Sequence, residues 1–220
     1  MIISTQNPHI LTVSNNLVVF PMLIWKSSIF LFIMDETPEV SGELILDQTH
    51  ISNASMIHDL QQKGYGEIEK NQLLLKQFET LYLLYTNKLV LKKNKKQIDF
   101  DSYMSICQKT NSEILTKFLI FRDLKTRGYV VKDGFGFGSD FRVYERGHFG
   151  EKGAKYLIFG LNEGQQEKMG ALQKKIEDIT NMGKEPIIAV IDRRGEVIYY
   201  KINKMDFFEN KARLEDNLEF

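Results

Sequence analysis

The chain has 220 residues, 43% of them hydrophobic and 26% charged, a composition typical of one large or two small globular domains with a sizeable core. Its 29 basic and 29 acidic side chains give a formal net charge of zero. Proteins that bind nucleic acid through bulk charge are usually basic, so any contact of this chain with nucleic acid must be local or shared with a partner subunit. The single cysteine, Cys107, excludes an internal disulfide and a multi-cysteine zinc site and indicates a reducing, cytoplasmic environment.

The first 33 residues contain an apolar run at 17–25, which Lys26 and two serines separate from a second apolar run at 29–34. Neither run reaches the roughly 20 residues of a membrane-spanning helix, and a central charge costs about 3 kcal/mol on insertion scales. No basic region precedes the runs, which disfavours a signal peptide. We interpret residues 1–33 as an N-terminal strand or an extension, and we expect natural translation to start at Met34, where the composition changes sharply.

The first half of the chain, residues 34–110, alternates strand-like and helical patterns. Alternating apolar and polar residues indicate a strand, and apolar residues three and four positions apart indicate a helix. The expected elements are, in chain order, a strand at 42–47, helices at 52–63 and 69–85, a strand at 89–91, a basic turn at 92–96, and a helix at 99–107 capped by Asp99 or Asp101. The basic turn could contact RNA, but a solvated hairpin tip needs no function.

The second half, residues 111–206, follows a polar segment at 109–112 where we place the domain boundary. The expected elements are a helix at 118–127, strands at 129–131, 141–144 and 156–160, a helix at 165–181, a strand at 187–191, a turn at 192–195 with Gly195 at the position that needs positive φ, and a returning strand at 197–202. Residues 207–220 form a charged tail. These patterns predict an α+β protein, in which a small N-terminal α/β domain precedes a mixed sheet with flanking helices.

Two motifs in the second half suggest chemistry only weakly. Gly134, Gly136 and Gly138 lack the spacing of a dinucleotide fingerprint and precede a strand, so a tight turn is the better interpretation. Asp140 and Glu151 match no metal-nuclease signature. Three histidines elsewhere in the chain show no metal-ligand spacing: His9, His50 and His58. We therefore expect no metal and no cofactor.

A charged, glycine-rich loop follows the strand that ends at Tyr144. It contains Arg146, His148, Glu151 and Lys152. A lone histidine in a loop is usually a surface residue, and a tyrosine in a strand usually packs in the core. On residue types alone, a catalytic role for this loop is one interpretation among several.

Residues 113–202 resemble the C-terminal catalytic domain of archaeal tRNA-splicing endonucleases. The most specific parts are the strand start Arg127-Gly128-Tyr129, the Gly-x-Asp-Phe-x-x-Tyr strand at 138–144, and Lys184 just before an apolar strand. The first half is similar through Tyr65-Gly66-Glu67 and the helical segment 78–83. The resemblance implies a C-terminal nuclease domain that cuts precursor tRNA at bulged helical splice sites.

The resemblance also implies a metal-free mechanism. Tyr144 would deprotonate the ribose 2′-hydroxyl, His148 would protonate the leaving 5′-oxygen, and Lys184 would stabilise the phosphorane, leaving a 2′,3′-cyclic phosphate and a 5′-hydroxyl. A histidine with a pKa near 6.5 suits general acid catalysis. A lysine stabilises developing negative charge electrostatically. We expect the nearby cations to bind the substrate, and these are Arg142, Arg146 and Lys155.

One position departs from the family pattern. Family members place the catalytic histidine at the start of the next strand, three residues before a tyrosine, and that position is Gly153 here. His148, which lies between Gly147 and Gly150, could replace it or could be a bystander. The expected assembly is a homo-oligomer or a heteromer with a paralogous subunit. The alternatives are a non-catalytic structural subunit beside a catalytic paralogue and a plain RNA-binding module.

Overall fold

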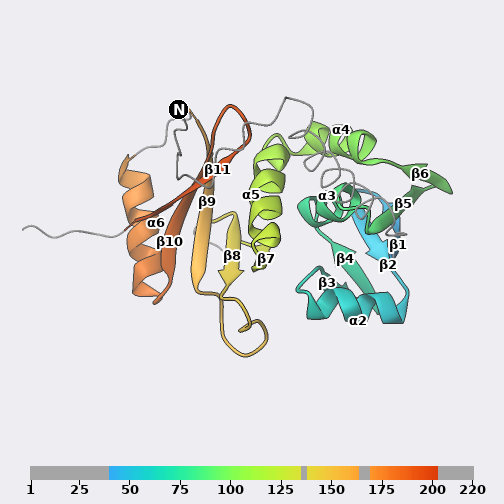
Figure 1. Ribbon diagram of the computed structural model, residues 1–220, viewed down its shortest axis with the longest axis horizontal. Helices are drawn as coiled ribbons and strands as arrows, with labels where there is room; N and C mark the ends of the chain where they lie inside the picture. Colours follow the sequence, from blue (N-terminus) through green and yellow to red (C-terminus); the bar gives the residue numbers. More distant parts are fainter. Residues whose placement is uncertain (1–39, 135–137, 164–168, 203–220) are drawn as a thin grey trace, which may run out of the picture.

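The structure is a computed structural model that describes residues 40–134, 138–163 and 169–202. The predicted extension at 1–33, the start at Met34 and the charged tail at 207–220 lie outside these residues. The described chain forms two sheets that lie side by side along the long axis, with helix α5 between them (Figure 1). No helix in these ranges is long and apolar enough to cross a membrane.

The first half forms a six-stranded sheet with the order β3-β4-β2-β1-β5-β6. Its elements are β1 (Val40–Ile45), β2 (Gln48–Ile51), α2 (Ala54–Gln62), β3 (Glu67–Glu69), β4 (Gln72–Leu75), α3 (Gln77–Tyr85), β5 (Leu89–Lys93), β6 (Lys96–Ile98) and α4 (Phe100–Thr110). Asp99 caps α4, because its side chain accepts a hydrogen bond from the main chain of Ser102. The basic run is a hairpin tip, as predicted, with positive φ at Asn94 and Lys95.

The single long helix predicted over residues 69–85 is wrong. Residues up to Leu75 form the β3–β4 hairpin, and α3 begins only at Gln77. The two residues between the strands, Lys70 and Asn71, have φ values of 48° and 63°, as a tight two-residue hairpin turn requires. Leu73 and Leu75 alternate into the core beside β2, so the apolar residues follow a period of two before they follow the helical period.

The second half forms a five-stranded mixed sheet with the order β11-β10-β9-β8-β7. Its elements are α5 (Ile114–Thr126), β7 (Val130–Asp133), β8 (Phe141–Tyr144), β9 (Tyr156–Asn162), α6 (Met169–Asn181), β10 (Glu185–Ile191) and β11 (Val197–Lys201). Strands β9 and β10 are parallel and the other pairs antiparallel. The predicted mixed sheet and α+β class are therefore confirmed.

Helices α5 and α6 cover opposite faces of this second sheet. Successive side chains of a strand point to opposite faces. On β9, Leu157 and Phe159 cluster with Ile179 of α6, whereas Ile158 joins the main core with the residues of α5. Strands β9 and β10 are thus packed on both faces, and the catalytic candidates lie near the ends at which these strands begin.

Aromatic packing joins the two halves into one core. The ring centroids of Phe78 on α3 and Phe121 on α5 are 4.9 Å apart, and those of Phe78 and Phe141 on β8 are 5.1 Å apart. The boundary proposed at 109–112 falls at the end of α4 and the short connection to α5. It remains a prediction, since the core is continuous across it.

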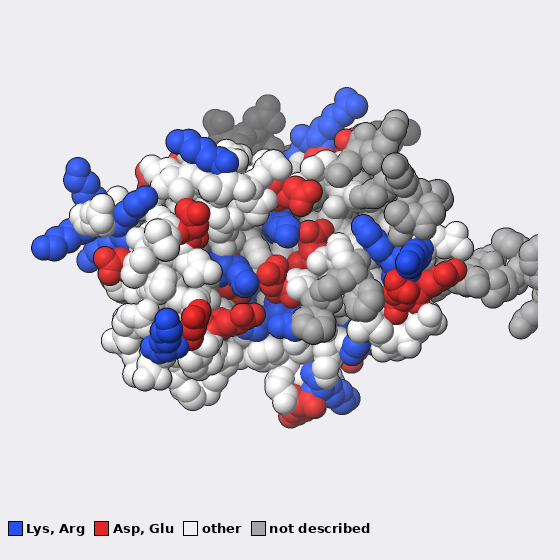
Figure 2. All heavy atoms as spheres, turned by 180° about the vertical axis from the view of Figure 1, so that it is seen from behind, with Lys and Arg blue, Asp and Glu red and all other residues white. Residues whose placement is uncertain are grey.

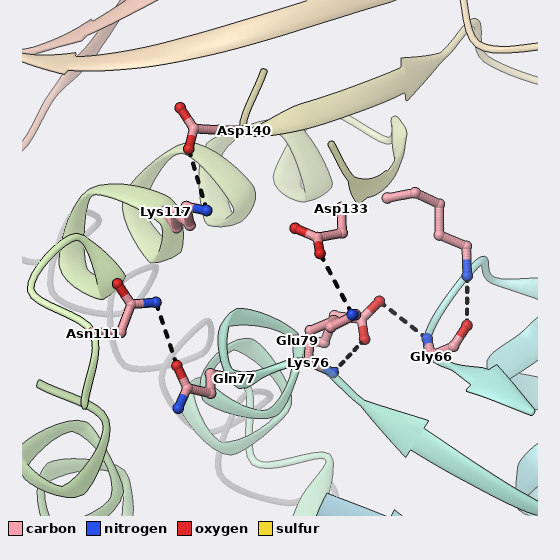
Figure 3. A network of polar contacts seen from close by, with 9 residues as sticks. Gly66, Lys76, Gln77, Glu79, Asn111, Lys117, Asp133 and Asp140 are labelled. Atoms are coloured by element: carbon pink, nitrogen blue, oxygen red, sulfur yellow. Dashed lines mark hydrogen bonds and ion pairs between the residues drawn. The ribbon is translucent and has the colours of Figure 1, made fainter. Parts of the chain in front are cut away.

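A buried carboxylate adds polar contacts between the halves (Figure 3). Glu79 is 1% exposed, and its two carboxylate oxygens accept hydrogen bonds from the main-chain N–H groups of Gly66 and Lys76, at 3.0 and 2.8 Å. The carbonyl of Gly66 in turn accepts a hydrogen bond of 2.6 Å from the ammonium of Lys132 on β7. Lys76 lies 3.5 Å from Asp133 on the same strand. The β7 edge is thus held by the loop that Glu79 organises.

Candidate active site

Strand β8 presents Tyr144 at its C-terminal end. Phe141 and Val143 are buried, so Arg142 and Tyr144, which alternate with them, point to the other face and are half-buried. Tyr144 lies opposite Val130 of β7 in the ladder. The glycine-rich loop 145–155 follows the strand, and Figure 1 shows this loop extending beyond the ends of the strands.

Asp140 fixes the other end of β8 and is a structural residue. Its carboxylate accepts a hydrogen bond of 2.8 Å from the main chain of Gly160 and lies 3.3 Å from the ammonium of Lys117. Gly160 has no room for a side chain, because a Cβ there would lie 2.7 Å from Ile120. The aspartate in the Gly-x-Asp motif therefore sets the position of β8 against β9.

The glycine-rich segment before β8 behaves as a turn at the two ends that the structure describes. The main-chain N–H of Gly134 donates a hydrogen bond of 2.8 Å to the carbonyl of Asp140. A Cβ on Gly134 would lie 1.8 Å from the carbonyl oxygen of Ser139, and Gly138 has φ of 69°. The backbone thus folds tightly on itself here, which favours the turn over a phosphate-binding loop.

His148 lies in the middle of the loop and contacts its own loop. Its main-chain carbonyl accepts hydrogen bonds from the N–H groups of Glu151 and Lys152, at 3.2 and 3.0 Å. Its ring Nδ1 is buried and lies 3.7 Å from the carboxylate of Glu151, while the side chain as a whole is 36% exposed. Among the described residues, no polar contact joins the imidazole to Tyr144 or Lys184. A protonated imidazole would attract this carboxylate.

Lys184 approaches the same loop from the start of β10. The main chain of Glu185 donates a hydrogen bond of 2.9 Å to Lys155, which aligns the beginnings of β10 and β9. The half-buried Lys184 side chain places its ammonium 3.3 Å from the position that a Cβ on Gly153 would occupy. The structure therefore brings Lys184 to the position where the resemblance expects a histidine.

The three catalytic candidates are thus connected through one loop. Tyr144 ends the strand before the loop, His148 lies in the loop, and the ammonium of Lys184 lies beside it at Gly153. The ring of Tyr144 packs edge to face on Phe149, the neighbour of His148, with centroids 5.0 Å apart at 87°. The loop is the single element that all three share.

The cations expected to bind the substrate have different partners. The guanidinium of Arg146 lies 4.7 Å from the centre of the Tyr129 ring. The ammonium of Lys155 donates a hydrogen bond of 3.0 Å to Glu145, which lowers the pKa of Glu145 and raises the pKa of Lys155. Arg142 is half-buried on β8, on the same strand face as Tyr144. Arg146 and Lys155 lie at the two ends of the loop.

Two residues of this site, Phe149 and Glu145, were not predicted from the sequence. Phe149 is the one large apolar side chain in an otherwise polar and glycine-rich loop, and that contrast was the available signal. Glu145 gave no signal, because an exposed glutamate beside an arginine is ordinary. Within the described ranges, no group of three His, Cys, Asp or Glu side chains is placed to hold a metal ion.

Charges of both signs are mixed around the site and over the surface. On the face shown in Figure 2, basic and acidic side chains are interspersed across the described residues and form no broad basic area. Several cations have acidic partners, such as Lys201 with Glu185 at 2.9 Å. Any binding of a polyanion would therefore depend on a few placed cations.

Comparison with protein families gives two adjacent matches. Residues 40–104 match the N-terminal domain of tRNA intron endonuclease, and residues 114–199 match the catalytic C-terminal domain of tRNA intron endonuclease. The two matches meet near the connection between α4 and α5.

Curated relatives agree with these matches. A tRNA-splicing endonuclease of Methanococcus maripaludis is 35% identical over 147 residues, which cover 66% of this chain and 83% of the relative. A tRNA-splicing endonuclease of Pyrococcus furiosus is 28% identical over 165 residues, which cover 75% of this chain and 89% of the relative.

Proposed function

Because the chain belongs to the tRNA intron endonuclease family, we propose that it excises introns from precursor tRNA at bulged helical splice sites. We further propose that the reaction needs no metal ion and leaves a 2′,3′-cyclic phosphate and a 5′-hydroxyl. One observation supports the proposal: Tyr144 ends the strand that leads into the loop 145–155, His148 lies in this loop, and the ammonium of Lys184 lies 3.3 Å from the position that a Cβ on Gly153 of the same loop would occupy.

Tyr144 is the proposed general base. It removes the proton of the ribose 2′-hydroxyl, and the 2′-oxygen then attacks the adjacent phosphorus. A phenol with a pKa near 10 is a weak base at neutral pH unless a cation lowers its pKa. In the proposed site the cation of this region is Lys184, whose ammonium reaches the same loop at Gly153.

His148 is the proposed general acid. As the bond from phosphorus to the 5′-oxygen breaks, the imidazolium gives its proton to that oxygen, so the leaving group departs as an alcohol. General acid catalysis requires the donor within hydrogen-bond reach of the leaving oxygen in the bound state. The carboxylate of Glu151 lies 3.7 Å from the ring Nδ1.

Lys184 is the proposed electrostatic catalyst. The pentacoordinate phosphorane carries more negative charge on its non-bridging oxygens than the starting diester does. A preorganised ammonium beside those oxygens stabilises the transition state more than the ground state. The position of Lys184 against Gly153 leaves its ammonium within the site rather than on a distant surface.

The remaining proposals concern the substrate and the assembly. Arg142, Arg146 and Lys155 would bind the phosphates on either side of the cut. Two copies, or this chain and a paralogue, would pair through the C-terminal apolar strands, because the edge strand β11 exposes Ile198 and Tyr200, at 47% and 52%.

A second candidate function is a structural subunit that positions RNA beside a catalytic paralogue. Gly153 favours it, because no imidazole stands at the position the family uses. A plain RNA-binding module unrelated to splicing is disfavoured by the matches to both domains of the family.

A cleavage assay on the purified protein tests the proposal. A precursor tRNA transcript with a bulge-helix-bulge intron is incubated with the protein alone in excess EDTA, and the ends of the products are analysed. We expect an excised intron with cyclic phosphate and 5′-hydroxyl ends. Cleavage only after a paralogue is added would support the structural-subunit alternative, and loss of the chemical step in EDTA, restored by magnesium, would contradict the metal-free mechanism.

A further inference from the structure

The loop that contains His148 has a defined internal structure. The main-chain N–H of His148 donates to the carbonyl of Glu145 at 3.1 Å, and the His148 carbonyl accepts from Glu151 and Lys152. Phe149 also forms an isolated bridge with Lys152. The loop therefore folds on itself. Its position relative to the sheet depends on a separate contact.

Phe149 attaches the loop to the sheet. It is half-buried, and its ring packs edge to face against Tyr144 with centroids 5.0 Å apart. Phe149 follows His148 directly in the chain, so a fixed position of its ring restrains the adjacent main chain of the histidine. The residue that packs against the proposed base is thus the chain neighbour of the proposed acid.

A turn in the first half of the chain packs behind Phe149. A Cβ added to Gly64, in the turn after α2, would lie 3.5 Å from Cζ of Phe149 and 2.3 Å from Cγ1 of Val130. Val130 is the residue paired with Tyr144 in the β7–β8 ladder. Gly64 therefore lies next to both Phe149 and Val130, the strand partner of Tyr144.

Two lysines of the second half hold this turn in place. Lys125 on α5 donates a hydrogen bond of 3.1 Å to the carbonyl of Lys63, and Lys132 on β7 donates one of 2.6 Å to the carbonyl of Gly66. The ammonium of Lys125 also lies 4.2 Å from the centre of the Tyr65 ring. Every residue of the turn 63–66 is thus bonded to, or packed against, the second half.

We infer that Phe149, packed on Tyr144, is a positioning residue for His148, and that the turn 63–66 of the N-terminal half shapes the active site by supporting Phe149. The inference rests on the proposed function, because it assigns Phe149 a role in that reaction. It also assigns the N-terminal half a part in catalysis, through packing rather than through contact with the substrate.

The test compares Phe149→Leu and Gly64→Ala with a matched control, Gly128→Ala. Gly64 and Gly128 have φ of 78° and 81°, so alanine is strained equally at both, but a Cβ on Gly128 meets nothing within 4 Å. Only Gly64→Ala therefore adds an atom beside Phe149, at 3.5 Å from its Cζ, and this atom also displaces Val130, which it would approach to 2.3 Å. Each variant is assayed in single turnover on the normal substrate and on one with a 5′-thio leaving group, which departs without a proton.

We expect Phe149→Leu and Gly64→Ala to slow cleavage of the normal substrate about 10-fold to 100-fold, a part of the roughly 10²–10⁴ that one acid–base group supplies. The thio substrate should be cut at nearly the wild-type rate, as should both substrates by Gly128→Ala. Equal slowing of the normal and thio substrates, or no slowing of either, would overturn the inference.

A second readout does not depend on cleavage. The ring signals of His148, assigned by comparison with His148→Ala, are recorded by NMR in the RNA-free protein. They should shift in Phe149→Leu and Gly64→Ala and not in Gly128→Ala. Unchanged signals in all three variants would contradict the positioning role. If the wild type cuts no substrate, the proposed function fails, while this comparison still decides whether Phe149 holds the loop.

Discussion

The ammonium of Lys184 lies 3.3 Å from the point that a Cβ on Gly153 would occupy. The glycine that departs from the family pattern thus faces the ammonium of Lys184, the proposed electrostatic catalyst. A side chain at position 153 would share its space with the flexible end of Lys184, which can move aside. Gly153 therefore lies beside the group that is proposed to stabilise the phosphorane.

Replacing Lys184 with alanine should reduce the single-turnover cleavage rate by about 10²–10³, the loss typical for one preorganised electrostatic group. The affinity for precursor tRNA and the thermal unfolding temperature should stay close to the wild type, because none of the ion pairs among the described residues involves Lys184. Lys174→Ala, on the exposed side of α6, is the matched control. Cleavage at the wild-type rate by Lys184→Ala would remove this lysine from the mechanism.

Gly153→His should restore cleavage to the His148→Ala variant. An imidazole at this position would contact Lys184 and stand where the family places its general acid. Gly153→Ala in the same background adds the Cβ without the ring and should restore nothing. Single-turnover rates of the two double variants give the answer, and equal rates would show that position 153 cannot deliver the proton.

Glu79 should make folding stability depend on pH. Burial raises the pKa of Glu79 above its ordinary value, so between the unfolded and folded pKa values the folded state binds more protons. The free energy of unfolding should therefore fall as the pH rises from about 4.3, the ordinary Glu value, through that window. Glu79→Gln cannot titrate and should lose this slope in urea unfolding measured across the range.

Glu79→Ala should also be strongly destabilising. It leaves the N–H groups of Gly66 and Lys76 without their acceptor, and an unsatisfied buried donor costs about 1–3 kcal/mol. Glu69→Ala, on an exposed strand position, is the control. Equal stability of the two variants would contradict the structural role of Glu79.

The exposed edge of the second sheet should mediate assembly. Ile198→Glu with Tyr200→Glu places charges on β11 and should shift the protein toward a smaller species in light scattering, since a charged edge resists pairing. Leu115→Glu, at an apolar position of α5 with 44% exposure, should leave the mass unchanged. A fully active wild-type monomer at micromolar concentration would contradict this prediction.

The sequence predicted most of the strands and helices, because alternation and helical spacing report local burial directly. The prediction failed at residues 69–75, because a leucine-rich run fits both the helical period and the strand period. The turn at Lys70 and Asn71 makes this segment a hairpin. Tyr144 and Lys184 were found through the resemblance rather than through spacing. The proximity of Phe149 to Gly64 could not be predicted, because these residues belong to segments far apart in the chain, and periodicity carries no information on such packing.

The most direct test of the account is the rate of His148→Ala on paired substrates with oxygen and sulfur at the leaving 5′ position. As the general acid, His148 should contribute about 10²–10⁴ to the rate on the oxygen substrate. The sulfur substrate should be cut at nearly the wild-type rate, because a thiolate leaves without a proton. A variant that cuts the oxygen substrate as fast as the wild type would contradict the account and place the acid on water, another side chain or a partner subunit.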